Sequence, residues 1–299
     1  MTNLSNQHVM LKDSRRLGYA EYGDLQGEPL FYCHGFPASR LEARVIDGPA
    51  RKHGWHIIAV DRPGYGLSDF KPKRRILDWP DDVAELAHIL NISSFSLLGM
   101  SGGGPYALAC AWKIPSCLRG VSIVNSLGPV YQSWAVHEMK WPARLGFGLA
   151  KRASRLLPFI YGGIVARALY WFPRLTRSLL TISAPEADSQ ALKRPDMERF
   201  HLGSIQEAFR NGPKGALLDF KLYAHPWGFQ LKDISLNIQL WQGEADATVP
   251  PSHARYLAKT LPAAQVHYLP NEGHFSVFVN YISNILENLK ETRKKPIRQ

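Results

Sequence analysis

Residues 95–109, FSLLGMSGGGPYALA, decide the fold of this chain. The stretch begins as a short apolar run, which predicts a buried strand, and ends as an Ala/Leu-rich segment with Pro105 near its start, which predicts a helix. Between them stands the pattern G-x-S-x-G, from Gly99 to Gly103. A strand that turns at once into a helix strains the corner residue and brings the flanking chain so close that a Cβ would clash. The turn therefore places the Ser101 hydroxyl at its tip, with the helix N-terminus pointing at it.

Length and charge bound the possible functions. The 299 residues allow one large α/β domain with an insertion or two small domains. Hydrophobic residues make up 45% of the chain, which is enough for a sizeable core. Much of the formal charge of +11 lies in the tail, residues 290–298, and in the middle of the chain. No nucleic-acid-binding motif accompanies this charge, so we expect no nucleic acid as partner.

The cysteines and the apolar runs of the sequence indicate in which cellular compartment the protein is expected. Cys33, Cys110 and Cys117 are too few and too irregularly spaced for a disulfide framework or a zinc site. We expect them to be buried free thiols in a reducing compartment. The first residues lack the basic region and apolar core of a signal peptide, and no uninterrupted apolar run is long enough to span a bilayer. These features predict a soluble, cytoplasmic protein without a transmembrane segment.

Short apolar runs alternate with helical patterns along most of the chain. A hairpin is predicted at 8–11 and 17–22, and further strands and helices follow it in alternation. The predicted strands are 30–33, 55–60, 95–100, 121–124, 238–241 and 265–269, and the predicted helices are 39–53, 78–90, 252–260 and 275–290. This alternation predicts an α/β fold with a mostly parallel, doubly wound sheet.

The alternation stops from about Gly128 to Lys232, where no strand is predicted. Similar strands flank this stretch, so an insertion fits better than two domains in series. We therefore expect an α/β core domain made of residues 1–127 and 233–299. Residues 128–232 are predicted to form a helical cap, or lid, inserted between two strands of the sheet.

Two further loops supply partners for the serine. The G-x-S-x-G pattern also occurs in plain Gly-rich turns, and a serine hydroxyl is a weak nucleophile until a base takes its proton. His274 follows a predicted strand, and Asp246 follows the strand before it, so parallel pairing brings both to the edge where Ser101 lies. Each alone could be an ordinary turn residue. Together, in the order Ser101, Asp246, His274, they indicate a catalytic triad.

Backbone N–H groups next to the serine predict an oxyanion hole. Gly102, directly after Ser101, would give one donor. The loop His34-Gly35-Phe36-Pro37 would give the second from Phe36, since Pro37 has no N–H. We expect His34 to orient this loop and not to act as a base. The alternative for His34-Gly35 is a plain tight turn.

The motifs together resemble those of the α/β-hydrolase fold superfamily, in its serine-nucleophile branch of esterases and lipases. The matching stretches run from residue 34 to residue 274 and leave only the insertion without a recognisable pattern. They are 34–37, 61–68, 99–103, 243–250 and 273–274. The resemblance implies that residues 61–68 shape the core turn and the pocket wall, and that residues 128–232 cover the pocket.

The predicted function is hydrolysis of a carboxylic ester through an acyl-enzyme, with an apolar, ester-like small molecule as substrate and no metal or organic cofactor. Dehalogenases and epoxide hydrolases of this superfamily carry aspartate where this chain has Ser101, which argues against both. Proline iminopeptidases usually have tryptophan after the serine, where this chain has Gly102. Carbon–carbon bond hydrolases, perhydrolases and aminopeptidases on the same triad remain alternatives, as does a ligand-binding protein without catalysis.

The predicted cap is rich in aromatic and basic side chains. The aromatic residues could line an apolar pocket or form the core of the cap itself, and the second reading is favoured for most of them; they are Trp134, Trp141, Phe147, Phe159, Tyr161, Tyr170, Trp171 and Phe172. The basic residues predict a solvated helix face or, as the alternative, weak contact with an anionic membrane surface. They are Arg144, Lys151, Arg152, Arg155, Arg167, Arg174 and Arg177.

Overall fold

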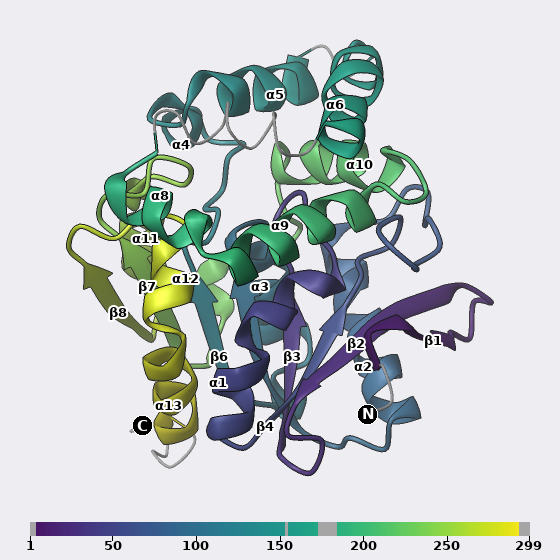
Figure 1. The fold of residues 1–299 in the computed structure, drawn as a ribbon, viewed down its shortest axis with the longest axis vertical. Helices are drawn as coiled ribbons and strands as arrows, with labels where there is room; N and C mark the ends of the chain where they lie inside the picture. The colour runs from purple at the N-terminus through teal and green to yellow at the C-terminus, as the bar shows by residue number, and fades with distance from the viewer. Residues whose placement is uncertain (1–3, 153–154, 173–183, 293–299) are drawn as a thin grey trace.

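An eight-stranded sheet runs through the molecule (Figure 1). The computed structural model describes residues 4–152, 155–172 and 184–292. The strands are β1 (Gln7–Met10), β2 (Arg16–Gly23), β3 (Glu28–Cys33), β4 (Trp55–Val60), β5 (Phe95–Met100), β6 (Leu118–Val124), β7 (Ile238–Gly243) and β8 (Ala264–Leu269). Their order is β1-β2-β4-β3-β5-β6-β7-β8; β1 and β2 pair antiparallel, and β3 to β8 run parallel. The predicted mostly parallel sheet is confirmed.

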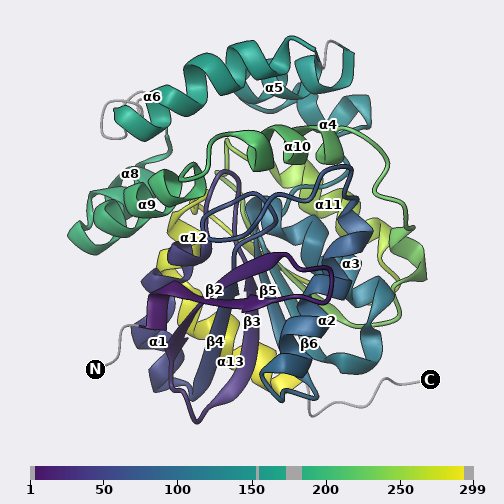
Figure 2. The ribbon, with the colours of Figure 1, turned by 90° about the vertical axis from the view of Figure 1, so that its right-hand side faces the viewer.

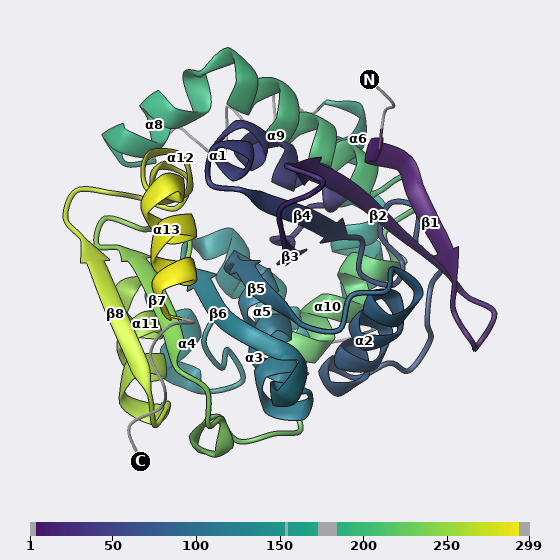
Figure 3. The ribbon, with the colours of Figure 1, turned by 90° about the horizontal axis from the view of Figure 1, so that it is seen from below.

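Helices cover both faces of the sheet, as seen from below in Figure 3. One face packs against α1 (Asp47–Lys52) and α13 (Ile282–Thr292), and the other against α2 (Trp79–Ile89), α3 (Gly104–Lys113) and α11 (Pro251–Thr260). Successive residues of a strand point to opposite faces. In β5, Phe95 and Leu97 join the apolar cluster of α2 and α3, while Leu98 and Met100 join that of α1 and α13. Burial on both faces explains why this strand is mostly apolar, with Ser96 as its one polar side chain.

Two predicted helices are each divided in the structure. The pattern at 39–53 becomes the 3₁₀ helix η2 (Arg40–Ile46) followed by α1, because Pro49 has no N–H to continue one helix through that point. The pattern at 275–290 becomes α12 (Ser276–Asn280) and α13, which are separated at Tyr281. The remaining short helices outside the insertion are η1 (Leu4–Asn6), η3 (Ile76–Asp78), η4 (Ser101–Gly103) and η5 (Pro115–Cys117).

Residues 128–232, here called the helical segment, connect β6 to β7 and contain no strand in their described part. Their elements are α4 (Ser133–His137), α5 (Trp141–Arg152), the π-helix η6 (Pro158–Val165), α6 (Ala166–Trp171), α8 (Glu186–Lys193), α9 (Pro195–Ala208), α10 (Lys214–Tyr223) and η7 (Leu231–Asp233). Figure 2 shows α5 and α6 as the layer farthest from the sheet, with α9 and α10 beneath them. Over its described ranges the chain has no helix with the length and hydropathy needed to cross a bilayer.

Candidate active site

Ser101 occupies the corner between β5 and the helical turn that leads into α3. Its φ of 52° lies in the left-handed region, which residues with a side chain rarely adopt. Gly103 shows how tight the corner is, since a Cβ there would lie 2.0 Å from the Cys33 carbonyl oxygen of the neighbouring strand. The backbone strain and the close approach that the G-x-S-x-G pattern predicts are both present.

His274 and Asp246 meet at the same edge of the sheet. His274 Nδ1 lies 2.7 Å from Asp246 Oδ2, and both side chains are buried. The other carboxylate oxygen of Asp246 accepts hydrogen bonds from the N–H groups of Thr248 (2.7 Å) and Val249 (2.9 Å). The carboxylate is therefore fixed from one side and presents its free oxygen to the imidazole.

The pKa of His274 reflects two opposing effects. Burial on its own lowers the pKa, because a charged imidazole loses its hydration. The negative charge of Asp246 and its hydrogen bond raise the pKa, and the charges of Asp188 and Glu42 raise it further. The pKa of His274 therefore lies above its ordinary value. The surrounding carboxylates thus favour the protonated ring.

Asn125 joins the loops that carry Asp246 and His274. It follows β6 directly, is fully buried and has a φ of 46°. Its side-chain amide donates to the carbonyl oxygens of Gly273 (3.1 Å) and His274 (2.8 Å), and its side-chain oxygen accepts from the Gly243 N–H (2.9 Å). Sequence reasoning missed this residue. A polar side chain directly after a buried strand at the reactive edge is the signal that could have found it.

Asp188 of α8 also holds the histidine loop. The Asp188 side chain is buried, and its carboxylate accepts hydrogen bonds from three consecutive N–H groups, those of His274 (2.8 Å), Phe275 (2.8 Å) and Ser276 (2.9 Å). These groups stand at the start of α12, where backbone donors lack partners within the helix and the helix dipole favours an anion. Sequence reasoning missed Asp188 because 86 residues separate it from His274 and no local pattern connects them.

Phe36 and Gly102 lie side by side, as the predicted oxyanion hole requires. A Cβ at Gly102 would lie 2.6 Å from the Phe36 Cβ and 3.4 Å from the Phe36 backbone nitrogen. Glu42 accepts a 2.7 Å hydrogen bond from the Gly35 N–H, and Arg62 donates to the carbonyl oxygens of His34 and Gly35. The backbone before Phe36 is thus bound on both its donor and its acceptor sides.

His34 is a structural residue of this loop. Its Nε2 accepts a hydrogen bond from the Arg62 N–H (3.1 Å), so its Nδ1 carries the proton and donates to the Gly35 carbonyl (2.9 Å). Burial and the charge of Arg62 hold the pKa of His34 well below its ordinary value. The neutral ring orients the loop, in agreement with the expectation from the sequence.

A buried ionic network lies beneath this loop, centred on Asp219 of α10. Its carboxylate accepts from Arg62 Nε (3.0 Å), from Arg74, and from the hydroxyl groups of Tyr65 (2.8 Å) and Tyr106 (2.6 Å). Burial alone would raise the pKa of Asp219, but Arg74 and Arg62 hold it far below its usual range. Sequence reasoning missed this residue as well, because 157 residues separate it from Arg62.

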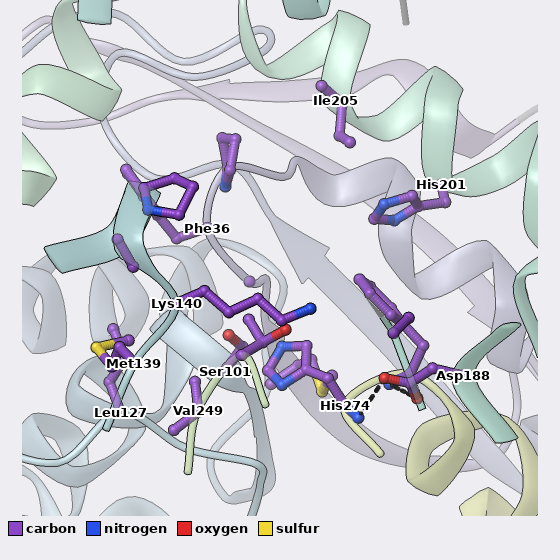
Figure 4. A pocket seen from close by; sticks show the side chains of 18 of the residues that line it. Phe36, Ser101, Leu127, Met139, Lys140, Asp188, His201, Ile205, Val249 and His274 are labelled. Carbon is purple, nitrogen blue, oxygen red and sulfur yellow. Dashed lines mark hydrogen bonds between the residues drawn. The ribbon is translucent and has the colours of Figure 1, made fainter. Parts of the chain in front are cut away.

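Ser101 and His274 line one cavity of about 320 Å³ (Figure 4). Most of its other walls are apolar and come from both the sheet edge and the helical segment; among them are Phe36, Leu127, Phe147, Tyr161, Ile205 and Val249. A cavity of this size suits a small organic molecule. In the described part of the chain, no group of three or more His, Cys, Asp or Glu side chains could hold a metal ion.

Five of the eight aromatic residues named from the sequence are neither pocket wall nor core. Phe147 and Tyr161 are buried and line the cavity, and Trp134 packs against His253 and Tyr256. The expectation that most of the eight form the core of the segment is wrong for five exposed residues, Trp141, Phe159, Tyr170, Trp171 and Phe172. Of the seven basic residues named from the sequence, Arg174 and Arg177 lie outside the described residues.

A sequence profile of the alpha/beta hydrolase fold family matches residues 28–281. The chain belongs to this family. Among related α/β hydrolases, Lipase 1 from Psychrobacter immobilis is 22% identical over 304 aligned residues, which cover 98% of this chain and 85% of that protein. Bifunctional epoxide hydrolase 2 from Sus scrofa is 29% identical over 126 residues, 41% of this chain and 22% of that protein. The match therefore spans less than a quarter of that relative.

Solved structures of α/β hydrolases share the whole fold. A bromoperoxidase from Bacillus anthracis superimposes with a TM-score of 0.71 over 97% of this chain and 100% of that chain, at 19% sequence identity. The similarity covers nearly the whole of this chain. It shows the α/β-hydrolase fold and leaves the chemistry to be argued from the site.

Proposed function

We propose that this α/β hydrolase cleaves carboxylic esters with Ser101 as nucleophile, His274 as general base and Asp246 as the residue that orients His274. The contact that carries the proposal is the 2.7 Å hydrogen bond between His274 and Asp246 beside a cavity that Ser101 also lines. With Nδ1 donating to Asp246, the other ring nitrogen of His274 is the one left to accept a proton.

The reaction follows from these roles. His274 takes the hydroxyl proton as Ser101 Oγ attacks the ester carbonyl, and Asp246 stabilises the imidazolium that forms. The N–H groups of Phe36 and Gly102 hold the negative carbonyl oxygen of the tetrahedral intermediate. His274 then gives its proton to the leaving alcohol, and an acyl-enzyme remains. Water, activated by His274, attacks the acyl carbon and releases the acid and free Ser101.

The cavity favours an apolar acyl group as substrate. Its walls carry several aromatic and aliphatic side chains and few polar ones, which suits a chain or ring that is removed from water. The similarity to Lipase 1 over nearly the whole chain supports an ester substrate. The serine at position 101 supports it too, since by family resemblance epoxide hydrolases carry aspartate there. We assign the helical segment, residues 128–232, the role of a cap over this cavity.

The test is hydrolysis of p-nitrophenyl esters, from acetate to laurate, by the wild type and by Ser101→Ala. We expect turnover by the wild type and a loss of about 10,000-fold or more in Ser101→Ala, with the fold intact. Ser252→Ala is the matched control, because the Ser252 hydroxyl is buried and has no hydrogen-bond partner. Near-normal turnover by Ser101→Ala would refute the mechanism.

If the wild type hydrolyses none of these esters, another function is favoured. A fluorophosphonate probe that still labels Ser101 in that case would indicate an active serine with a different substrate, such as an amide, a carbon–carbon bond or a peracid. A protein that neither hydrolyses the esters nor reacts with the probe would be a ligand-binding α/β hydrolase without catalysis.

A further inference from the structure

The excess positive charge of the chain is concentrated in one part of the helical segment. Residues 139–185 contain eight Lys or Arg residues and no Asp or Glu, whereas the whole chain has 36 basic and 25 acidic residues. The described part of this stretch holds α5, η6 and α6, the layer farthest from the sheet in Figures 1 and 2. Five of the eight basic residues are described and exposed in this layer: Arg144, Lys151, Arg152, Arg155 and Arg167.

The same layer exposes large apolar side chains to solvent. Trp141 is 74% exposed, Phe159 75%, Ile164 68% and Trp171 69%, and Leu145 and Leu156 are about half exposed at 48% and 52%. Single exposed apolar residues are common on soluble proteins, but six large ones within one layer of helices indicate a surface that binds a partner.

The two sides of α5 have different surroundings. Phe147 and Ala150 are buried on its inner side, and Phe147 lines the cavity next to Ser101. Trp141, Leu145 and Arg152 recur at helical spacing on the opposite side and are exposed. The helix that forms a wall of the cavity thus turns an apolar and basic face outward.

The exposed basic side chains have no carboxylate partners. In residues 4–152, 155–172 and 184–292, no ion pair involves Arg144, Lys151, Arg152, Arg155 or Arg167. Lys151 donates to the Tyr131 carbonyl (2.8 Å) and Arg167 to the Gly163 carbonyl (3.4 Å), which leaves their charges uncompensated. We call these five basic residues, with the six exposed apolar residues above, the outer face.

We propose that the outer face binds the surface of an anionic lipid bilayer. Tryptophan and phenylalanine side chains partition into the headgroup region, and Arg and Lys are attracted to anionic lipids. A bilayer surface satisfies both kinds of side chain at once, which explains why they occur together on helices that also wall the cavity. An apolar ester held in the bilayer would meet the protein next to its substrate pocket.

A second copy of the chain and a nucleic acid fit this surface less well. A symmetric dimer would place the outer face against itself, so that uncompensated positive charges would stand opposite each other. A nucleic acid would match the charge but would give Leu145, Leu156 and Ile164 no apolar surroundings. The bilayer is the occupant that accounts for both the charges and the aliphatic side chains.

The proposal is tested by flotation with vesicles of phosphatidylcholine alone and with 30% phosphatidylglycerol. We expect the full-length protein to float with the anionic vesicles and to bind the neutral ones at least about tenfold more weakly, with binding reduced by salt. The triple variant Arg144→Gln/Arg152→Gln/Arg155→Gln should lose about tenfold or more in affinity for the anionic vesicles. Phe159→Ser/Trp171→Ser should weaken the binding that persists at high salt.

A matched control variant distinguishes binding by the outer face from a general effect of the net charge of the protein. Lys52→Gln/Lys232→Gln/Arg255→Gln removes the same charge from exposed positions elsewhere and should bind vesicles like the wild type. Equal loss in the control variant, or no binding of the wild type to anionic vesicles, would overturn the proposal. So would a dimer in solution that Phe159→Ser/Trp171→Ser converts to a monomer. Ser101→Ala should still bind vesicles, so the result does not depend on the proposed chemistry.

Discussion

The helical segment has an inner side and an outer face, and the two differ in the sign of their charges. On the inner side, the carboxylates of Asp188, Glu207 and Asp219 are buried against the sheet and its loops. Glu207 accepts a 2.7 Å hydrogen bond from Arg40, which is itself fully buried. On the outer face, the basic groups have no carboxylate partner in the described ranges, and the stretch 139–185 has no acidic residue at all.

This difference shows how one segment can serve two purposes. A charge pair in a buried site interacts strongly because little water screens it. The inner carboxylates therefore hold the helical segment against the loops of the candidate active site. Charges in solvent are screened within about 8–10 Å and contribute little to the fold. We therefore expect inner substitutions to change stability and catalysis, and outer substitutions to change only what the surface binds.

The largest effect is expected for Asp219→Ala. This change leaves Arg62 and Arg74 buried without their carboxylate, which costs about 3–5 kcal/mol when one partner of a buried pair is removed. Urea denaturation would measure the loss. Asp196→Ala removes an exposed carboxylate that pairs with Arg194 and should cost no more than about 1 kcal/mol. Equal losses in the two variants would contradict the comparison.

A smaller effect, centred on catalysis, is expected for Asp188→Asn. The neutral amide has one acceptor oxygen for the three N–H groups of the histidine loop, so His274 is held less firmly. We expect kcat for ester hydrolysis to fall about 10- to 100-fold with KM nearly unchanged, since a small displacement of a catalytic group costs this much. The matched control is Glu186→Gln, on the same helix.

The pH dependence of kcat/KM shows whether Asp188→Asn disturbs the position of His274 or only destabilises the protein. The charge of Asp188 helps to raise the pKa of His274, so its removal should move the acid limb of kcat/KM to lower pH. A variant that is merely less stable would lose rate without this shift. Unchanged kcat together with an unchanged profile would show that Asp188 does not position His274.

Local motifs predicted the fold, and they also predicted that the three candidate catalytic residues lie together, because each follows its own strand. Ser101, Asp246 and His274 all follow apolar runs that read as parallel strands, so their meeting at one edge follows from topology. Asp188 and Asp219 could not be predicted in this way. They come from helices whose placement over the sheet depends on tertiary packing, and nothing near them in sequence points to His274 or Arg62.

The exposed aromatic residues illustrate a second limit of the sequence. Trp141, Phe159 and Trp171 lie on helices that are apolar on more than one side, so periodicity does not say which side meets the sheet. The expectation of a core role assumed that large apolar side chains avoid water. In α5 the structure buries Gly146, Phe147 and Ala150 and leaves Trp141 and Leu145 exposed, so the size of an apolar side chain does not decide which side faces inward.

The smallest effect is expected when substitutions on the outer face are tested for a change in the pH dependence of catalysis. If His274 is the general base, as we propose, it accepts the proton of Ser101 only when neutral, so the rate should fall as the pH drops through a pKa above the ordinary 6.5 of histidine. The outer variant Arg144→Gln/Arg152→Gln/Arg155→Gln removes three positive charges, but these side chains are exposed to solvent and none of them lines the cavity. Its inflection in kcat/KM on a soluble ester should therefore stay within about 0.2 pH units of the wild type. A larger shift would mean that the outer charges reach the active site, and that the two sides of the segment are electrostatically coupled.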